Sequence, residues 1–228
     1  MLVDYTHICI VLDRSGSMDS IKDDMIGGLN KLLKDQREAP GKATLSLYRF
    51  DHEIELLSNF VDLKLIGSFN KGTLDPRGST ALLDAIGFAI NETGRVLGQT
   101  QEQLRPSKVI FLIITDGEEN SSKEFSYTEI AEKIKHQTET YKWEFVFLGA
   151  NQNAITTGSK IGIAKANAMT YAPNTNGIES AVHSLSSNVR SYRAGGQSVG
   201  FSDDDRNIQT SCGVAVADEP ESTGNVIN

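Results

Sequence analysis

Short apolar strands that alternate with amphipathic helices predict an α/β protein. We expect a doubly wound, mostly parallel open sheet that is flanked by helices. Residues 8–12 and 109–114 are continuous apolar runs, which is typical of parallel strands buried on both faces. Residues 19–37 and 82–97 repeat apolar side chains every three to four positions, and this is the period of a helix.

The other segments continue the alternation and add one antiparallel strand. After Pro40-Gly41, residues 44–50 and 54–57 have a hairpin pattern, which predicts an antiparallel strand at one edge of the sheet. Glycine and proline mark residues 67–78 as a loop. Further along, we expect a helix over 130–141, a strand over 144–148, a short helix over 155–163, a short strand over 168–171 and a last helix over 178–192.

The composition is that of an ordinary globular protein. The chain has 228 residues, of which 39% are hydrophobic and 23% charged, and this suits one α/β domain with an appendage. No apolar run approaches the ~20 residues that span a bilayer, and the first five residues do not have the pattern of a signal peptide. We therefore expect a cytoplasmic protein, with Cys9 and Cys212 as free thiols.

The net charge limits the class of partner. It is −8 at neutral pH, from 22 basic and 30 acidic side chains. Nucleic-acid backbones and anionic membranes both require clustered cations, so we expect neither of them as a partner. The oligomeric state stays open.

Oxygen-bearing side chains follow two of the predicted buried strands and one loop. Asp13, Ser15 and Ser17 come directly after the first apolar run. Thr80 ends the glycine-rich loop, and Asp116 follows the apolar run 109–114. All three stretches precede helical patterns, and open α/β sheets place their ligands at such junctions. Two carboxylates and three hydroxyls suit a hard divalent cation, most naturally Mg²⁺.

This set resembles the metal-ion-dependent adhesion site of the von Willebrand factor A family. The family pattern is Asp-x-Ser-x-Ser, then a Thr, then an Asp, and the sequence matches it at all five positions. The family's Thr usually follows two glycines, whereas here the pair is Gly78-Ser79. The resemblance covers about residues 4–194 and implies the same open sheet with flanking helices. Within the family, the chain resembles intracellular prokaryotic and phage members.

The resemblance also implies a function and a cofactor. A divalent cation, Mg²⁺ with Mn²⁺ and Ca²⁺ as alternatives, would be held by Asp13, Ser15, Ser17, Thr80 and Asp116. An Asp or Glu of a partner protein would complete its coordination. The expected function is therefore a metal-dependent protein-interaction module or scaffold, without enzymatic activity.

Other interpretations of the same residues remain open. Ser15 or Ser17 could cap a helix, and Asp116-Gly117 could be an ordinary turn. A Mg²⁺-dependent phosphohydrolase with Asp13 as nucleophile is the rival function, although such enzymes need a second Asp where this chain has Ser15. A purely structural α/β domain is the third possibility.

Several polar residues near these stretches are interpreted as structural. Asp84 lies in the first turn of a helix, where a carboxylate favours the helix dipole, so we do not expect it to be a sixth ligand. We interpret Glu118, Glu119 and Asn120 as a solvated acidic loop. The alternative is that they form the rim of the metal site, where they would modulate the metal or contact the partner. His52 is expected in a solvated turn.

The sequence after the last helix changes in character. We expect one domain over residues 1–194 and a flexible acidic tail over 195–228, because Gly195-Gly196 ends the helical pattern and few large apolar residues follow. Asp203-Asp204-Asp205 is the main charge run of this tail. It is interpreted as solvated chain, with competition for the metal site as the alternative.

Overall fold

Six strands form a single sheet in the order β3-β2-β1-β4-β5-β6. The computed structural model describes residues 1–215. All neighbouring strands are parallel except β2 and β3, which are antiparallel, so the predicted sheet with one antiparallel edge strand is confirmed. The strands are β1 (Leu2–Asp13), β2 (Lys42–Phe50), β3 (Ile54–Asp62), β4 (Pro106–Thr115), β5 (Glu144–Gly149) and β6 (Ala168–Thr170).

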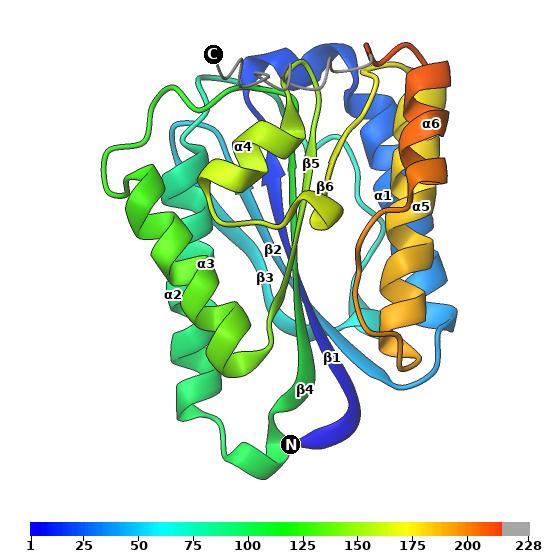
Figure 1. The fold of residues 1–228 in the computed structure, drawn as a ribbon. Helices are drawn as coiled ribbons and strands as arrows, with labels where there is room; N and C mark the ends of the chain where they lie inside the picture. Colours follow the sequence, from blue (N-terminus) through cyan, green and yellow to red (C-terminus); the bar gives the residue numbers. More distant parts are fainter. Residues whose placement is uncertain (216–228) are drawn as a thin grey trace, which may run out of the picture.

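Helices cover both faces of this sheet (Figure 1). One face packs against α1 and α5, and the other packs against α2, α3 and α4. The helices are α1 (Lys22–Glu38), α2 (Leu82–Gln99), α3 (Tyr127–Tyr141), α4 (Ala154–Lys160), α5 (Thr175–Arg193) and α6 (Asp203–Ser211). Short 3-10 turns include η1 (Gly16–Ser20), which precedes α1. Within residues 1–215, no helix is both long and apolar enough to cross a membrane.

The central strands β1 and β4 separate two hydrophobic cores. Alternate side chains of a strand point to opposite faces, so Ile10 and Leu12 pack toward α1 and α5 while Cys9 and Val11 pack toward α2 and α3. All four are fully buried. Burial on both faces explains why the sequence of this strand is continuously apolar and does not alternate.

The register between β1 and β4 brings the ends of these two strands together. Leu12 lies beside Ile114, so Asp13 and Thr115 leave the sheet at the same edge. The turn η1 and the loop before α3 begin there. The carboxyl ends of the central strands thus present Asp13 and Asp116 side by side.

The segment after α5 is folded, in contrast to the predicted flexible tail. Val199 and Phe201 are buried, and α6 packs against α5. The carboxylate of Asp205 accepts a bond from the Ser202 backbone amide at 2.8 Å and forms a capping box at the start of α6. The prediction of a flexible tail from residue 195 is therefore wrong up to residue 215, and the remainder, residues 216–228, lies outside the described residues.

Polar contacts fix α6, which is why an apolar pattern did not reveal it. The Gln209 side chain is buried; it accepts a bond from the Ala172 amide at 3.0 Å and donates to Gly177 O and Ser180 Oγ at 3.0 and 2.9 Å. Arg206 donates to the carbonyl of Ala168 at 2.7 Å. These bonds tie α6 to β6 and to the start of α5.

We expect Gln209→Ala to destabilise the fold by about 1–3 kcal/mol, because it leaves the buried backbone amide of Ala172 without its partner. Urea unfolding would measure the change. Asn207→Ala is the matched control on the exposed side of α6 and should be neutral or slightly stabilising. Equal free energies of unfolding for the Gln209→Ala variant and the wild type would contradict the assigned role of α6.

Candidate metal centre

The first part of the site is the turn that follows β1. The Ser15 amide donates to Asp13 Oδ1 at 2.6 Å, which folds the chain back over the carboxylate. The Ser15 and Ser17 hydroxyl oxygens lie 3.1 Å apart. Ser15 occupies the N-cap position of η1, yet its side chain makes no capping bond. The helix-cap interpretation of Ser15 is therefore wrong, and its hydroxyl points to the oxygen group instead.

The second part follows β4 and joins the first directly. Ser17 Oγ donates to Asp116 Oδ1 at 2.6 Å. Thr115 Oγ1 donates to Asp13 Oδ2 at 2.6 Å, so both oxygens of the Asp13 carboxylate have hydrogen-bond donors. Sequence reasoning did not assign a role to Thr115. Its signal was present in the sequence, since a polar Thr ends an otherwise apolar run just before Asp116.

Thr80 reaches the same place from the loop before α2. Its amide donates to Asn120 Oδ1 at 2.9 Å, and the Asn120 amide donates back to the Thr80 carbonyl at 3.1 Å. Gly117 gives a common reference point, because a Cβ built on it would lie 2.9 Å from Thr80 Oγ1 and 3.5 Å from both Ser15 Oγ and Ser17 Oγ. All five side chains that the sequence singled out thus gather around one point.

The two carboxylates carry negative charge that the described protein does not neutralise. Asp13 is fully buried and Asp116 is nearly so. Within residues 1–215, neither forms an ion pair with a lysine or arginine. Burial raises the pKa of Asp13 to about 6, against the opposing effect of the bonds from Thr115 and Ser15. Burial also raises the pKa of Asp116. A bound cation would relieve this cost of desolvation.

The donor set and the space fit a divalent metal ion. Hydroxyl and carboxylate oxygens are the ligands that hard cations prefer. Because Gly117 has no side chain, a space remains between the hydroxyl groups of Ser15, Ser17 and Thr80, and a single methyl group on Gly117 would enter it. We call this space the Gly117 cradle. Asp13, Ser15, Ser17, Thr80 and Asp116 would hold the ion; it would supply positive charge to an incoming acidic ligand.

Neighbouring acidic residues organise the loops around this group. The Asp84 carboxylate accepts hydrogen bonds from the amides of Lys123, Glu124 and Phe125 at 2.8–2.9 Å, so its role is structural, through the loop before α3 in addition to its place in the first turn of α2. Glu119 accepts the Leu83 amide at 3.0 Å. Together with Asn120, Glu119 therefore ties the loop after β4 to Thr80 and α2. Glu118 and Asn120 are exposed, in line with a solvated loop, whereas Glu119 is partly buried.

A second acidic cluster lies close by but already has cationic partners. Ligand atoms of Asp51, His52 and Glu53 lie within 4.8 Å of one another. However, Arg77 binds Asp51 at 2.7 Å and Glu53 at 2.6 Å, and Arg14 binds Asp51 at 3.1 Å. Guanidinium groups occupy the place of a metal there, so we assign this cluster to an ion-pair network.

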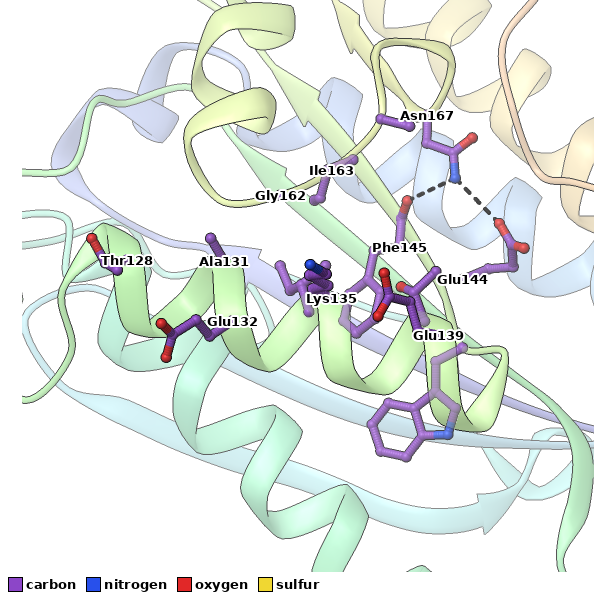
Figure 2. Close-up of a pocket in the computed structure, with 14 residues that line it drawn as sticks. Thr128, Ala131, Glu132, Lys135, Glu139, Glu144, Phe145, Gly162, Ile163 and Asn167 are labelled. Carbon is purple, nitrogen blue, oxygen red and sulfur yellow. Dashed lines mark hydrogen bonds between the residues drawn. The ribbon is translucent and has the colours of Figure 1, made fainter.

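A hollow of about 420 Å³ lies apart from the oxygen group. Figure 2 shows it between α3, the start of β5 and residues 162–167, where Asn167 donates to the Phe145 carbonyl and the Glu144 carboxylate. The β5 residues of its lining, Glu144 and Phe145, lie at the amino end of that strand, whereas Asp13 and Asp116 lie at the carboxyl ends of β1 and β4. It does not form part of the candidate metal centre.

Comparison with known proteins matches most of the chain to one domain family. Residues 7–183 match the von Willebrand factor type A domain model, which is more than half of the chain. No curated protein matches the sequence significantly.

Solved structures with the same fold are distant in sequence. Proximal thread matrix protein 1 from the mussel byssus, solved with a zinc-occupied metal-ion-dependent adhesion site motif, is 15% identical with a TM-score of 0.57. The match covers 82% of this chain and 46% of the mussel protein, so the chain spans less than half of that relative. The domain of the type V pili tip protein Mfa5 from Porphyromonas gingivalis is 8% identical, with a TM-score of 0.60 and coverage of 87% and 98%. A von Willebrand factor type A protein from Catenulispora acidiphila is 15% identical, with a TM-score of 0.52 and coverage of 83% and 42%.

We expect Gly117→Ala to weaken divalent-metal binding although it alters no ligand, because its Cβ would enter the cradle beside Thr80 Oγ1. Calorimetric titration with Mg²⁺ and Mn²⁺ would measure a loss of at least about tenfold in affinity. Gly98→Ala is the control, since nothing lies within 4 Å of its Cβ position. Wild-type affinity in the Gly117→Ala variant would show that the ion binds elsewhere.

Asp13→Asn should abolish metal binding and leave the protein folded. Asn keeps the size of the side chain but removes one of only two charged ligands. Burying the neutral Asn side chain in the metal-free protein costs less free energy than burying the Asp carboxylate. Titration calorimetry would follow the metal, and thermal unfolding in chelator would follow the fold. Undiminished affinity would refute the ligand assignment.

Proposed function

The chain belongs to the von Willebrand factor A family, and we propose that it is a metal-dependent protein-interaction module whose bound cation receives an acidic side chain of a partner. The observation that carries this proposal is the convergence of Asp13, Ser15, Ser17, Thr80 and Asp116 around the Gly117 cradle. These residues stand at the carboxyl edge of the sheet, on three separate loops.

The composition of the ligand set supports a foreign carboxylate as the remaining ligand. Mg²⁺ prefers six oxygen ligands in octahedral geometry, so five protein side chains leave it at least one position. Only two of the five are charged, and the three neutral hydroxyls leave the ion with strong attraction for another anion. An Asp or Glu of a partner protein offers that anion, and coordination offsets the cost of desolvating it.

We propose Mg²⁺ as the native ion, with Mn²⁺ and Ca²⁺ as alternatives. An all-oxygen ligand set with carboxylate and hydroxyl groups is the chemistry that favours these hard cations over softer ones. The zinc in the mussel protein's site supports a divalent ion in general. Competition titrations among the three ions would rank them for this chain.

The surroundings of Asp13 favour a binding role over the phosphohydrolase alternative. Its side chain is fully buried, and its two carboxylate oxygens accept bonds from the Ser15 amide and Thr115. Each carboxylate oxygen keeps a second lone pair, with which it can bind a cation. The phosphohydrolase alternative also needs an acid/base Asp two residues after the nucleophile, where this chain has Ser15, and we propose that the chain is not an enzyme.

We retain the cytoplasm as the proposed compartment. Cys9 is buried and Cys212 is partly buried, and both are free thiols. Unpaired cysteines are usual where the environment is reducing.

A peptide selection would test the proposed function. Random peptides selected on the immobilised protein in Mg²⁺ and eluted with chelator should contain an Asp or Glu that binding requires. Replacing that residue by Asn or Gln keeps its shape and should abolish binding. Retained binding of the amide peptides would overturn the carboxylate mechanism, and Mg²⁺-dependent hydrolysis of p-nitrophenyl phosphate that Asp13→Asn abolishes would favour the enzyme.

Thr80→Ala separates ligand binding from metal retention. A neutral hydroxyl contributes less to holding the cation than a carboxylate does, so we expect this variant to lose peptide binding more strongly than metal affinity. Asp13→Asn should lose both. If Thr80→Ala loses the metal as completely as Asp13→Asn, the division of roles between these ligands is wrong.

A further inference from the structure

We propose that Asp51, together with Arg14 and Arg77, is a positioning device that holds the Thr80 loop against the Asp13 turn and so preorganises the metal centre. The inference rests on the proposed function, because it concerns the same centre. None of these three residues is among the five oxygen ligands.

The Asp51 carboxylate joins the two loops through their side chains. It is fully buried; it accepts a hydrogen bond from Arg77 Nε at 2.7 Å and forms an ion pair with Arg14, whose Nε lies 3.1 Å away without making a hydrogen bond. Arg14 stands between the ligands Asp13 and Ser15, and Arg77 stands three residues before the ligand Thr80. One carboxylate therefore contacts both of the loops that carry these ligands.

The backbone makes the same connection a second time. The Ala81 amide donates to the Asp51 carbonyl at 2.8 Å, directly after Thr80. The Arg77 amide donates to the Arg14 carbonyl at 2.8 Å. Thr80 is thus bracketed: the chain is tied to Asp51 on both sides of it.

The charges of this network balance internally. Arg14, Arg49 and Arg77 face Asp51, Glu53 and Glu55, and Arg14 reaches Glu55 at 2.6 Å. The Arg14 guanidinium is buried and turned toward these acids, so it does not neutralise the adjacent Asp13. The network fixes the geometry of the metal centre while leaving its negative charge available to a cation.

The geometry of the intervening loop depends on the same arrangement. Gly78 has a φ of +65°, which favours glycine, and a Cβ there would lie 2.3 Å from His52 Nδ1. The Gly16 amide donates to the Gly78 carbonyl at 3.3 Å. The Thr80 loop therefore follows one narrow path between the β2–β3 turn and the Asp13 turn.

Arg77→Ala is the primary test, because Arg77 is 46% exposed and its loss does not open the core. We expect Mg²⁺ affinity to fall about tenfold, as is common when a group that orients a ligand is removed. The Tm in chelator should change by no more than about 4 °C. Arg95→Ala is the charge-matched control, since Arg95 is an exposed arginine that pairs only with Glu92 among the described acids. The Mg²⁺ affinity of this variant should equal that of the wild type.

A double-variant cycle distinguishes positioning from a general structural effect. If Arg77 acts through Thr80, adding Arg77→Ala to Thr80→Ala should weaken Mg²⁺ binding by less than about twofold. An equal tenfold loss in both backgrounds would overturn the inference.

Hydrogen exchange in the metal-free protein tests the device independently of metal binding. Protection of the Ala81 amide should fall about tenfold in Arg77→Ala and also in Asp51→Asn, if the latter folds, and stay unchanged in Arg95→Ala. Unchanged protection in Arg77→Ala would refute the inference. If the variants lose this protection but the wild-type protein binds neither Mg²⁺ nor Mn²⁺, the result would instead refute the proposed function.

Discussion

The parallel pairing of β1 with β4 is the constraint on which the candidate centre depends. Its register sets Leu12 beside Ile114, and the last residues of the two strands are then Asp13 and Thr115. The bond from Thr115 to Asp13 and the bond from Ser17 to Asp116 both follow from that alignment. A slip of one residue would reverse which face each side chain occupies, so the same hydrophobic cores that stabilise the sheet also fix the metal ligands.

The centre combines rigid support with unneutralised charge. Asp84, Glu119 and Asn120 satisfy backbone amides around Thr80 and α2, and thereby hold loops that have no regular structure of their own. The nearby guanidinium groups pair with a separate set of acids. As a result, positive side chains lie close to Asp13 without lowering the attraction of the site for a cation.

Most of the fold could be predicted because its signals are local. Continuous apolar runs identified β1 and β4, and a repeat of three to four residues identified α1, α2 and α5. Helix α6 was missed because polar side chains such as Gln209 and Arg206 anchor it. The spacing of apolar residues in a sequence cannot reveal polar contacts of this kind.

The same distinction applies to the site. The five oxygen residues could be found from their order and from their places after predicted strands, and the structure brings them together. The residues that hold the Thr80 loop could not be found, because Asn120 and Asp51 lie 40 and 29 positions from Thr80 in the chain and look like ordinary loop residues. Only the folded chain shows that each holds one end of the loop.

The positive φ of Gly78 has a consequence for recognising related sequences. Of the pair that precedes Thr80, Gly78 alone has the left-handed conformation, and Ser79 has an ordinary backbone. The second glycine of the usual family pattern is therefore dispensable in a chain with this loop path. A database search that demands two glycines before the threonine would pass over such members, whereas one that demands glycine at the first position and allows any small residue at the second would retain them.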